Sequence, residues 1–138
     1  MSSLTLNRNN TYTGTSALNA GTLIVGSNTA LGTGSVNASN GTTLDANTAA
    51  TLANNVNLGG TLTLGGTNAL TLGGSVAGIG GLVKNGAANL TLNGANTYFG
   101  NTALNSGKLI VGSNTALGSG TLNAAAETTL DANTAASA

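Results

Sequence analysis

The chain has 138 residues, which is enough for one hydrophobic core and short for two. Three basic and three acidic side chains cancel, so nothing in the charge steers the protein toward nucleic acid or anionic lipid. Only 4% of the residues are charged, and solubility must therefore come from Asn, Thr, Ser and Gly. The apolar fraction of 40%, with regularly spaced Leu, argues against a disordered chain.

In chain order, the predicted elements are short strands in which apolar residues alternate with polar ones. The clearest pairs are Leu4/Leu6, Leu23/Val25, Leu62/Leu64, Leu70/Leu72 and Leu90/Leu92. Asn-Gly and Gly-Gly pairs lie between them, and these residues accept a positive φ at turns. Strands of three to five residues are too short for a sandwich, whose strands run to about 5–6 residues or more. Such elements fit the coils of a β-solenoid.

An internal repeat supports this interpretation. A shift of 86 residues aligns Leu4–Ala50 with Leu90–Ala136, with identity at 34 of 47 positions. We therefore divide the chain into a complete copy at 4–89 and a partial copy at 90–138, within a single β-solenoid domain spanning 1–138. Dividing the repeat by four predicts about 21.5 residues per coil, with three strands and three corners in each. The expected fold is all-β, a parallel β-helix of about 6–7 coils of about 20–22 residues.

Membrane-spanning alternatives do not fit the sequence. No apolar run approaches the roughly 18 residues of a membrane helix, and the strands are shorter than the roughly 9–11 residues of a membrane barrel. We expect no membrane insertion by this segment. Met1–Ser3 leads directly into Leu4 without a basic or apolar leader, so we expect that the chain carries no signal peptide and that an exported parent protein is longer.

A family resemblance is carried by residues 80–100, which include Gly80-Gly81-Leu82, Lys84, Leu90-Thr91-Leu92 and Gly94-Ala95-Asn96-Thr97-Tyr98. Ala103–Gly118 continues the pattern, ending in Ala116-Leu117-Gly118. These motifs resemble the autotransporter-associated β-strand repeat. The first copy departs from the pattern at Arg8-Asn9, where the second has Gly94-Ala95. The resemblance implies a right-handed parallel β-helix in the passenger domain of a Gram-negative autotransporter, secreted or held at the cell surface.

Catalytic chemistry has little support in the residues. The sequence contains no His and no Cys, which excludes the usual triads, thiolate nucleophiles and soft-metal sites. Asp45 and Asp131 are equivalent in the two copies, and with four coils between them they would lie about 19 Å apart, beyond the range of a glycosidase pair. Glu127 and Asp131 could approach each other only around a corner. We therefore predict no enzyme: no catalytic, cofactor-binding or metal-binding residues and no cofactor.

Several other residues have structural interpretations. We expect Asp45 and Asp131 to form Asx turns at corners, Lys84 and Lys108 to be solvated, and Tyr12 and Tyr98 to support the coils rather than bind sugar. Asparagines at repeated positions could form amide ladders along the rod or simply tolerate the corners. Both interpretations stay open.

The resemblance and the repeat favour a non-enzymatic structural segment of an autotransporter passenger, a rigid stalk or adhesin scaffold that aids export and folding. Its partner would be a host or cell-surface receptor contacted through the parent protein, with no nucleic acid bound. The alternative is self-association, because the open solenoid ends carry unpaired strand edges that can stack into oligomers or fibres. A lesser alternative is an ice-binding β-solenoid, given Thr5, Thr61/Thr63, Thr71 and Thr91.

Overall fold

A computed structural model describes residues 3–132, and this part of the chain is built from short parallel strands without a helix. The strands are β1 Ser3–Leu6, β2 Ser16–Leu18, β3 Thr22–Val25, β4 Val36–Ala38, β5 Thr42–Ala46, β6 Ala50–Leu52, β7 Val56–Leu58, β8 Leu62–Leu64, β9 Leu70–Leu72, β10 Val76–Gly78, β11 Leu82–Lys84, β12 Leu90–Leu92, β13 Thr102–Leu104, β14 Lys108–Val111, β15 Leu122–Ala124 and β16 Thr129–Ala132.

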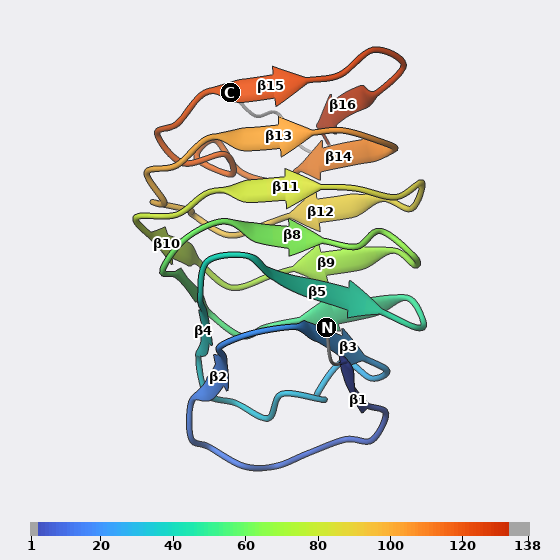
Figure 1. Cartoon of the computed structure of the whole chain (residues 1–138), viewed down its shortest axis with the longest axis vertical. Helices are drawn as coiled ribbons and strands as arrows, with labels where there is room; N and C mark the ends of the chain where they lie inside the picture. The colour runs from blue at the N-terminus through green and yellow to red at the C-terminus, as the bar shows by residue number, and fades with distance from the viewer. Residues whose placement is uncertain (1–2, 133–138) are drawn as a thin grey trace.

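These strands form three parallel sheets that run along the molecule (Figure 1). Sheet A has the order β1-β3-β5-β8-β11-β13-β15, sheet B the order β10-β7-β4-β2, and sheet C the order β16-β14-β12-β9-β6. Successive strands of the chain enter different sheets, and within each sheet every strand after the first pairs in register with the strand one coil earlier. The prediction of a parallel β-solenoid of about six turns is confirmed.

The core lies inside the three sheets and follows the alternation seen in the sequence. In a three-residue strand such as β9, Leu70 and Leu72 are buried while Thr71 points outward. Stacking sets inward leucines of successive coils side by side, as in the pairs Leu52↔Leu72 and Leu72↔Leu92. Each coil thus buries its apolar residues against its neighbours, which is the source of stability in a repeat architecture.

The coils are shorter than the length predicted by dividing the repeat into four. The pairs Leu4↔Leu23, Leu23↔Leu44 and Leu62↔Leu82 show that the steps between paired strands are close to one another but not identical in length. Four turns in sheet A carry the chain from Leu4 only as far as Lys84, and Leu90 lies one face further on, in sheet C. The repeat therefore spans four and one-third turns. Division by four was wrong because it assumed that both copies begin on the same face.

This one-third turn places equivalent strands of the two copies in different sheets. Strands β1, β3 and β5 lie in sheet A, whereas their counterparts β12, β14 and β16 lie in sheet C. The end of the partial copy, 133–138, lies outside the described part of the chain. Within the described part, the chain has no helix long and apolar enough to cross a membrane.

Candidate functional site: the open amino-terminal coil

The Asn and Ala-Leu-Gly motifs of the repeat meet across one coil. Asn96 is buried, its Nδ2 donates to the carbonyl of Ala116 at 2.6 Å, and its Oδ1 accepts from the backbone N–H of Val76 at 2.8 Å. In the first copy, Asn10 Nδ2 donates to the carbonyl of Ala30 at 2.7 Å. This asparagine thus fixes the turn that follows in the next coil. The bonds give a physical reason for the equal spacing of the two motifs in both copies.

Tyr98 lies inside the rod and supports the same turn. Its side chain is fully buried, and its hydroxyl shares a hydrogen bond with Thr102 Oγ1. Burial raises the pKa of Tyr98, and the bond to Thr102 partly opposes this rise. The Tyr98 carbonyl faces Gly118, where an added Cβ would collide with the carbonyl oxygen and φ is +62°. The tyrosine therefore supports the coil, and the turn beside it requires glycine.

Lys84 is buried, contrary to the expectation that it is solvated. It occupies an inward position of β11, between Leu64 and Leu104 of the neighbouring coils. Its Nζ donates to the carbonyls of Asn85 at 2.7 Å and Gly86 at 2.8 Å, with a longer bond to Ser106 at 3.3 Å. Burial lowers the pKa of Lys84. The alternation of Leu82-Val83-Lys84 was the signal that could have placed this side chain inside.

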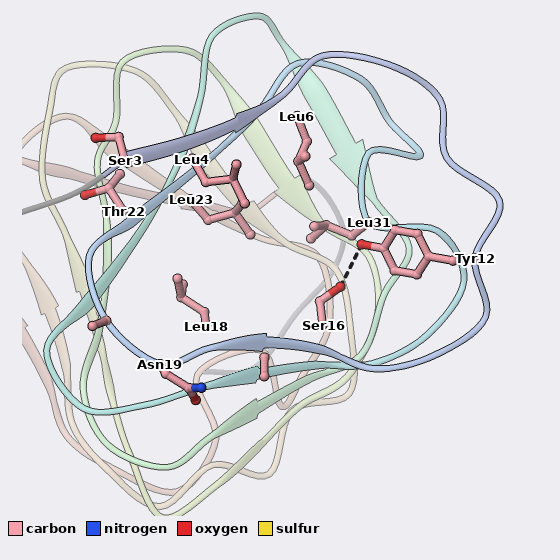
Figure 2. Close-up of a pocket in the computed structure, with 12 residues that line it drawn as sticks. Ser3, Leu4, Leu6, Tyr12, Ser16, Leu18, Asn19, Thr22, Leu23 and Leu31 are labelled. Atoms are coloured by element: carbon pink, nitrogen blue, oxygen red, sulfur yellow. Dashed lines mark hydrogen bonds between the residues drawn. The ribbon is translucent and has the colours of Figure 1, made fainter.

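The first coil is open where later coils are covered. Leu4, Leu6, Tyr12, Leu18, Leu23 and Leu31 line a hollow of about 370 Å³ at the amino-terminal end, the amino-terminal hollow (Figure 2). Leu4 is 59% exposed and Tyr12 is 41% exposed, whereas their counterparts Leu90 and Tyr98 are buried. Tyr12 makes the equivalent hydroxyl bond to Ser16 at 2.8 Å. The hollow is therefore the space that a preceding coil fills inside the rod.

The carboxylates are dispersed. Asp45 lies in β5 of sheet A and Asp131 in β16 of sheet C, so the expectation that they sit in corners is wrong. Asp45 accepts from the N–H groups of Ala46 and Thr67 and from the Thr67 hydroxyl. Asp131 accepts from the N–H of Ala132 and lies 4.0 Å from Lys108 Nζ. Among the described residues, no three His, Cys, Asp or Glu side chains are placed to hold a metal ion.

The outward polar residues form short columns. Thr51, Thr71 and Thr91 align in sheet C, but Ala53, Gly73 and Asn93 follow them two positions later in the chain, so the threonines form a single column. Amide pairs also occur, with Asn105 Nδ2 donating to Asn85 Oδ1 at 3.0 Å and Asn47 Nδ2 to Asn7 Oδ1 at 2.7 Å. Other asparagine side chains bond to the backbone at corners, such as Asn40 to Thr61. Asparagine side chains therefore pair with one another at some positions and bond to the backbone at corners in others.

Comparison with known protein families gives one match. Residues 2–25 and 82–111 match the family model described as the passenger-associated-transport-repeat. The two segments are copies of the same motif, and they include the equivalent residues Asn10 and Asn96 and the two tyrosines. The match confirms the resemblance to an autotransporter-associated repeat. Comparisons with curated proteins and with solved structures gave no significant match.

Proposed function

We propose that this chain, which carries two segments of the passenger-associated-transport-repeat, is a non-enzymatic structural segment of an autotransporter passenger. It forms a rigid stalk that holds other parts of a secreted or surface-held protein away from the cell, and its folding aids export. Contact with a host or cell-surface receptor is made through the parent protein.

The observation that carries this proposal is the continuous ladder through sheet A. Its strands from β1 to β15 pair in parallel, and inward side chains stack from coil to coil along the same line, most of them leucines, with Lys84 between Leu64 and Leu104. Each coil adds about 4.8 Å along the axis, so the whole ladder spans roughly 29 Å. A rod of this kind resists bending because every inner coil is bonded to both neighbours, and the described residues contain no hinge of unpaired chain between β3 and β15.

The surface chemistry is consistent with a spacer. The outward positions carry mainly Thr, Asn, Ala and Gly, and the few charged residues are spread along the sequence. We do not extend the proposal to ice binding, because the threonines of sheet C form one column rather than paired columns on successive coils.

Export of a chimeric passenger tests the proposal. The segment would replace an equal length of β-helix in a well-behaved autotransporter passenger that carries an epitope at its outer end. Epitope exposed on intact cells would be measured by flow cytometry. We expect near-normal exposure with the intact segment and a severalfold loss with a Leu64→Asp, Leu72→Asp variant, which breaks the core. Equal exposure of the epitope with the intact segment and with the variant would show that folding of this segment does not contribute to export.

A further inference from the structure

Among residues 3–132, three of the five large exposed apolar side chains lie at the two ends of the rod. Leu4 and Tyr12 lie on the first coil, and Leu130, 41% exposed, lies on the last described coil. The other two large exposed apolar residues, Ile79 and Phe99, lie side by side on one lateral corner, since Phe99 N–H donates to the Gly78 carbonyl and Gly100 N–H to the Gly80 carbonyl. Large apolar groups left in water at both ends favour contacts that cover them.

The strand edges at the two ends are complementary. Among the described strands, β1 is the first of sheet A and β15 is the last, and both run in the same direction along a parallel ladder. Each therefore leaves one row of backbone N–H and C=O groups without a strand partner in this sheet. A second molecule stacked in the same orientation would pair β1 with β15 and extend the ladder without reversing any strand.

The two ends also match in the path of the chain, which passes from sheet A to the face of sheet C after both β1 and β15. The chain leaves β1 for the face of sheet C: the Arg8 carbonyl accepts from Ser27 Oγ, and the adjacent Asn28 Oδ1 accepts from Thr51 N–H in β6. At the other end, the chain leaves β15 for β16, also in sheet C. Stacking β1 on β15 thus brings the segment around Arg8 over Leu130 and Asp131.

The charges at the two ends are opposite. Arg8 is the one charged side chain between residues 3 and 44, whereas Glu127 and Asp131 are those between residues 109 and 132. All three are exposed, and Lys108 lies 4.0 Å from Asp131, at the limit of an ion pair. Opposite charge at the two ends favours a head-to-tail contact over a contact between identical ends.

We propose that the isolated chain associates head to tail with a second copy of itself, with the amino-terminal hollow of one molecule seated on β15 and β16 of the next. Such a heterologous contact leaves a free end on each side, so it generates open chains. This association goes beyond the stalk function and does not depend on it.

Two variants, each of which blocks one end of the molecule, test whether unlike ends meet in the contact. Leu4→Asp places a carboxylate inside the contact of β1 with β15, and Leu130→Arg places a second cation opposite Arg8 of the next molecule, so each variant blocks one end. Because both leucines are substantially exposed, the fold is retained, which circular dichroism would verify. Sedimentation equilibrium would measure the mass of each protein alone and of an equimolar mixture.

We expect the mass of the wild type to rise with concentration beyond that of a dimer, and each variant alone to stay monomeric. The mixture should form a dimer and stop there, because one variant supplies an intact amino-terminal end and the other an intact carboxy-terminal end. A wild type that is monomeric at all concentrations would overturn the proposal, as would dimers formed by either variant alone, which require contact between identical ends. Ile79→Asp is the matched control, and loss of association in that variant would instead assign the contact to the lateral corner.

Charge exchange tests the register. Arg8→Glu should weaken association by about twofold to fivefold, the range of an exposed ion pair. Adding Asp131→Arg to that variant should recover most of the loss. If neither change alters association, Arg8 and Asp131 do not face each other and the proposed register is wrong.

Discussion

Tyr12 and Tyr98 occupy equivalent positions in the two copies of the repeat and make equivalent hydroxyl bonds, yet Tyr98 is fully buried and Tyr12 is 41% exposed. The difference lies in their neighbours rather than in their own sequence. Tyr98 has a coil on each side, whereas Tyr12 borders the amino-terminal hollow.

The ionisation of Tyr98 should make the stability of the protein depend on pH. Because burial raises the pKa of Tyr98 in the folded state, that state holds the proton more tightly than the unfolded chain does, where the pKa is close to 10.0. The resulting stability is complete below about pH 10 and is lost as pH rises through the raised value. The free energy of unfolding, measured in urea, should therefore fall more steeply between about pH 8 and pH 11 in the wild type than in Tyr98→Phe.

Lys84, whose pKa is lowered by burial, contributes a dependence on pH of opposite sign, but it does so equally in the wild type and in Tyr98→Phe. Identical pH dependence in wild type and Tyr98→Phe would contradict the burial of Tyr98.

Asn96→Ala should destabilise the protein by about 2–4 kcal/mol, because it leaves the buried Val76 N–H and Ala116 carbonyl without partners. Asn10→Ala removes one bond from a partly buried site at the open end and should cost about 1 kcal/mol. Urea unfolding of the two variants measures both. Equal losses at the two positions would show that the asparagine does not hold the turn as described.

Lys84→Met tests the carbonyl contacts at the corner of β11. Methionine fills a similar space but donates nothing to Asn85, Gly86 and Ser106, and we expect a loss of about 2 kcal/mol in the free energy of unfolding. Lys108→Met, at a partly exposed lysine, should change stability by about 0.5 kcal/mol or less. Thermal unfolding compares them, and a neutral or stabilising Lys84→Met would contradict a structural role for the ammonium group.

Glu127 has a φ of +66° at the position that Gly41 occupies in the first copy, where φ is +82°. A side chain is strained in this region, so Glu127→Gly should stabilise the protein by about 0.5–1 kcal/mol despite the greater flexibility of glycine in the unfolded chain. Gly41→Ala, at a site with open space around the added Cβ, should destabilise it by a similar amount. A calorimetric midpoint that falls in Glu127→Gly, or one that rises in Gly41→Ala, would contradict these backbone conformations.

The repeated Leu-x-Leu pattern and the Gly and Asn punctuation were enough to predict the solenoid, because alternation and turn chemistry are local properties. The phase of the repeat was not predictable from its length. That length is compatible with four longer turns or with four and one-third shorter ones, and only the pairing of Leu4 through Lys84 distinguishes them.

The sequence was enough to predict that the solenoid has an open end, but not which residues line it. A solenoid end has unpaired edges, but the exposure of Tyr12 depends on which residues a preceding coil would cover. Lys84 was wrongly expected to be solvated, because its charge was given more weight than its inward position in the alternation of Leu82-Val83-Lys84. The contacts of Asn96 reach a backbone N–H and a carbonyl in the two neighbouring coils, and sequence spacing alone does not show such bonds.

Removal of one coil tests the solenoid most directly. Deleting residues 61–80 joins Gly60 to Gly81 and brings Leu82 into the place of Leu62, its own partner in sheet A. The shortened protein should keep its β-sheet circular dichroism and cooperative unfolding, and its maximum dimension in X-ray scattering should fall by about 5 Å. Deleting only 61–70 places Gly73 and Gly74 at the positions of Thr63 and Leu64 and should unfold the protein. If the full-coil deletion unfolds the chain as completely as the half-coil deletion, the stacked-coil account is wrong.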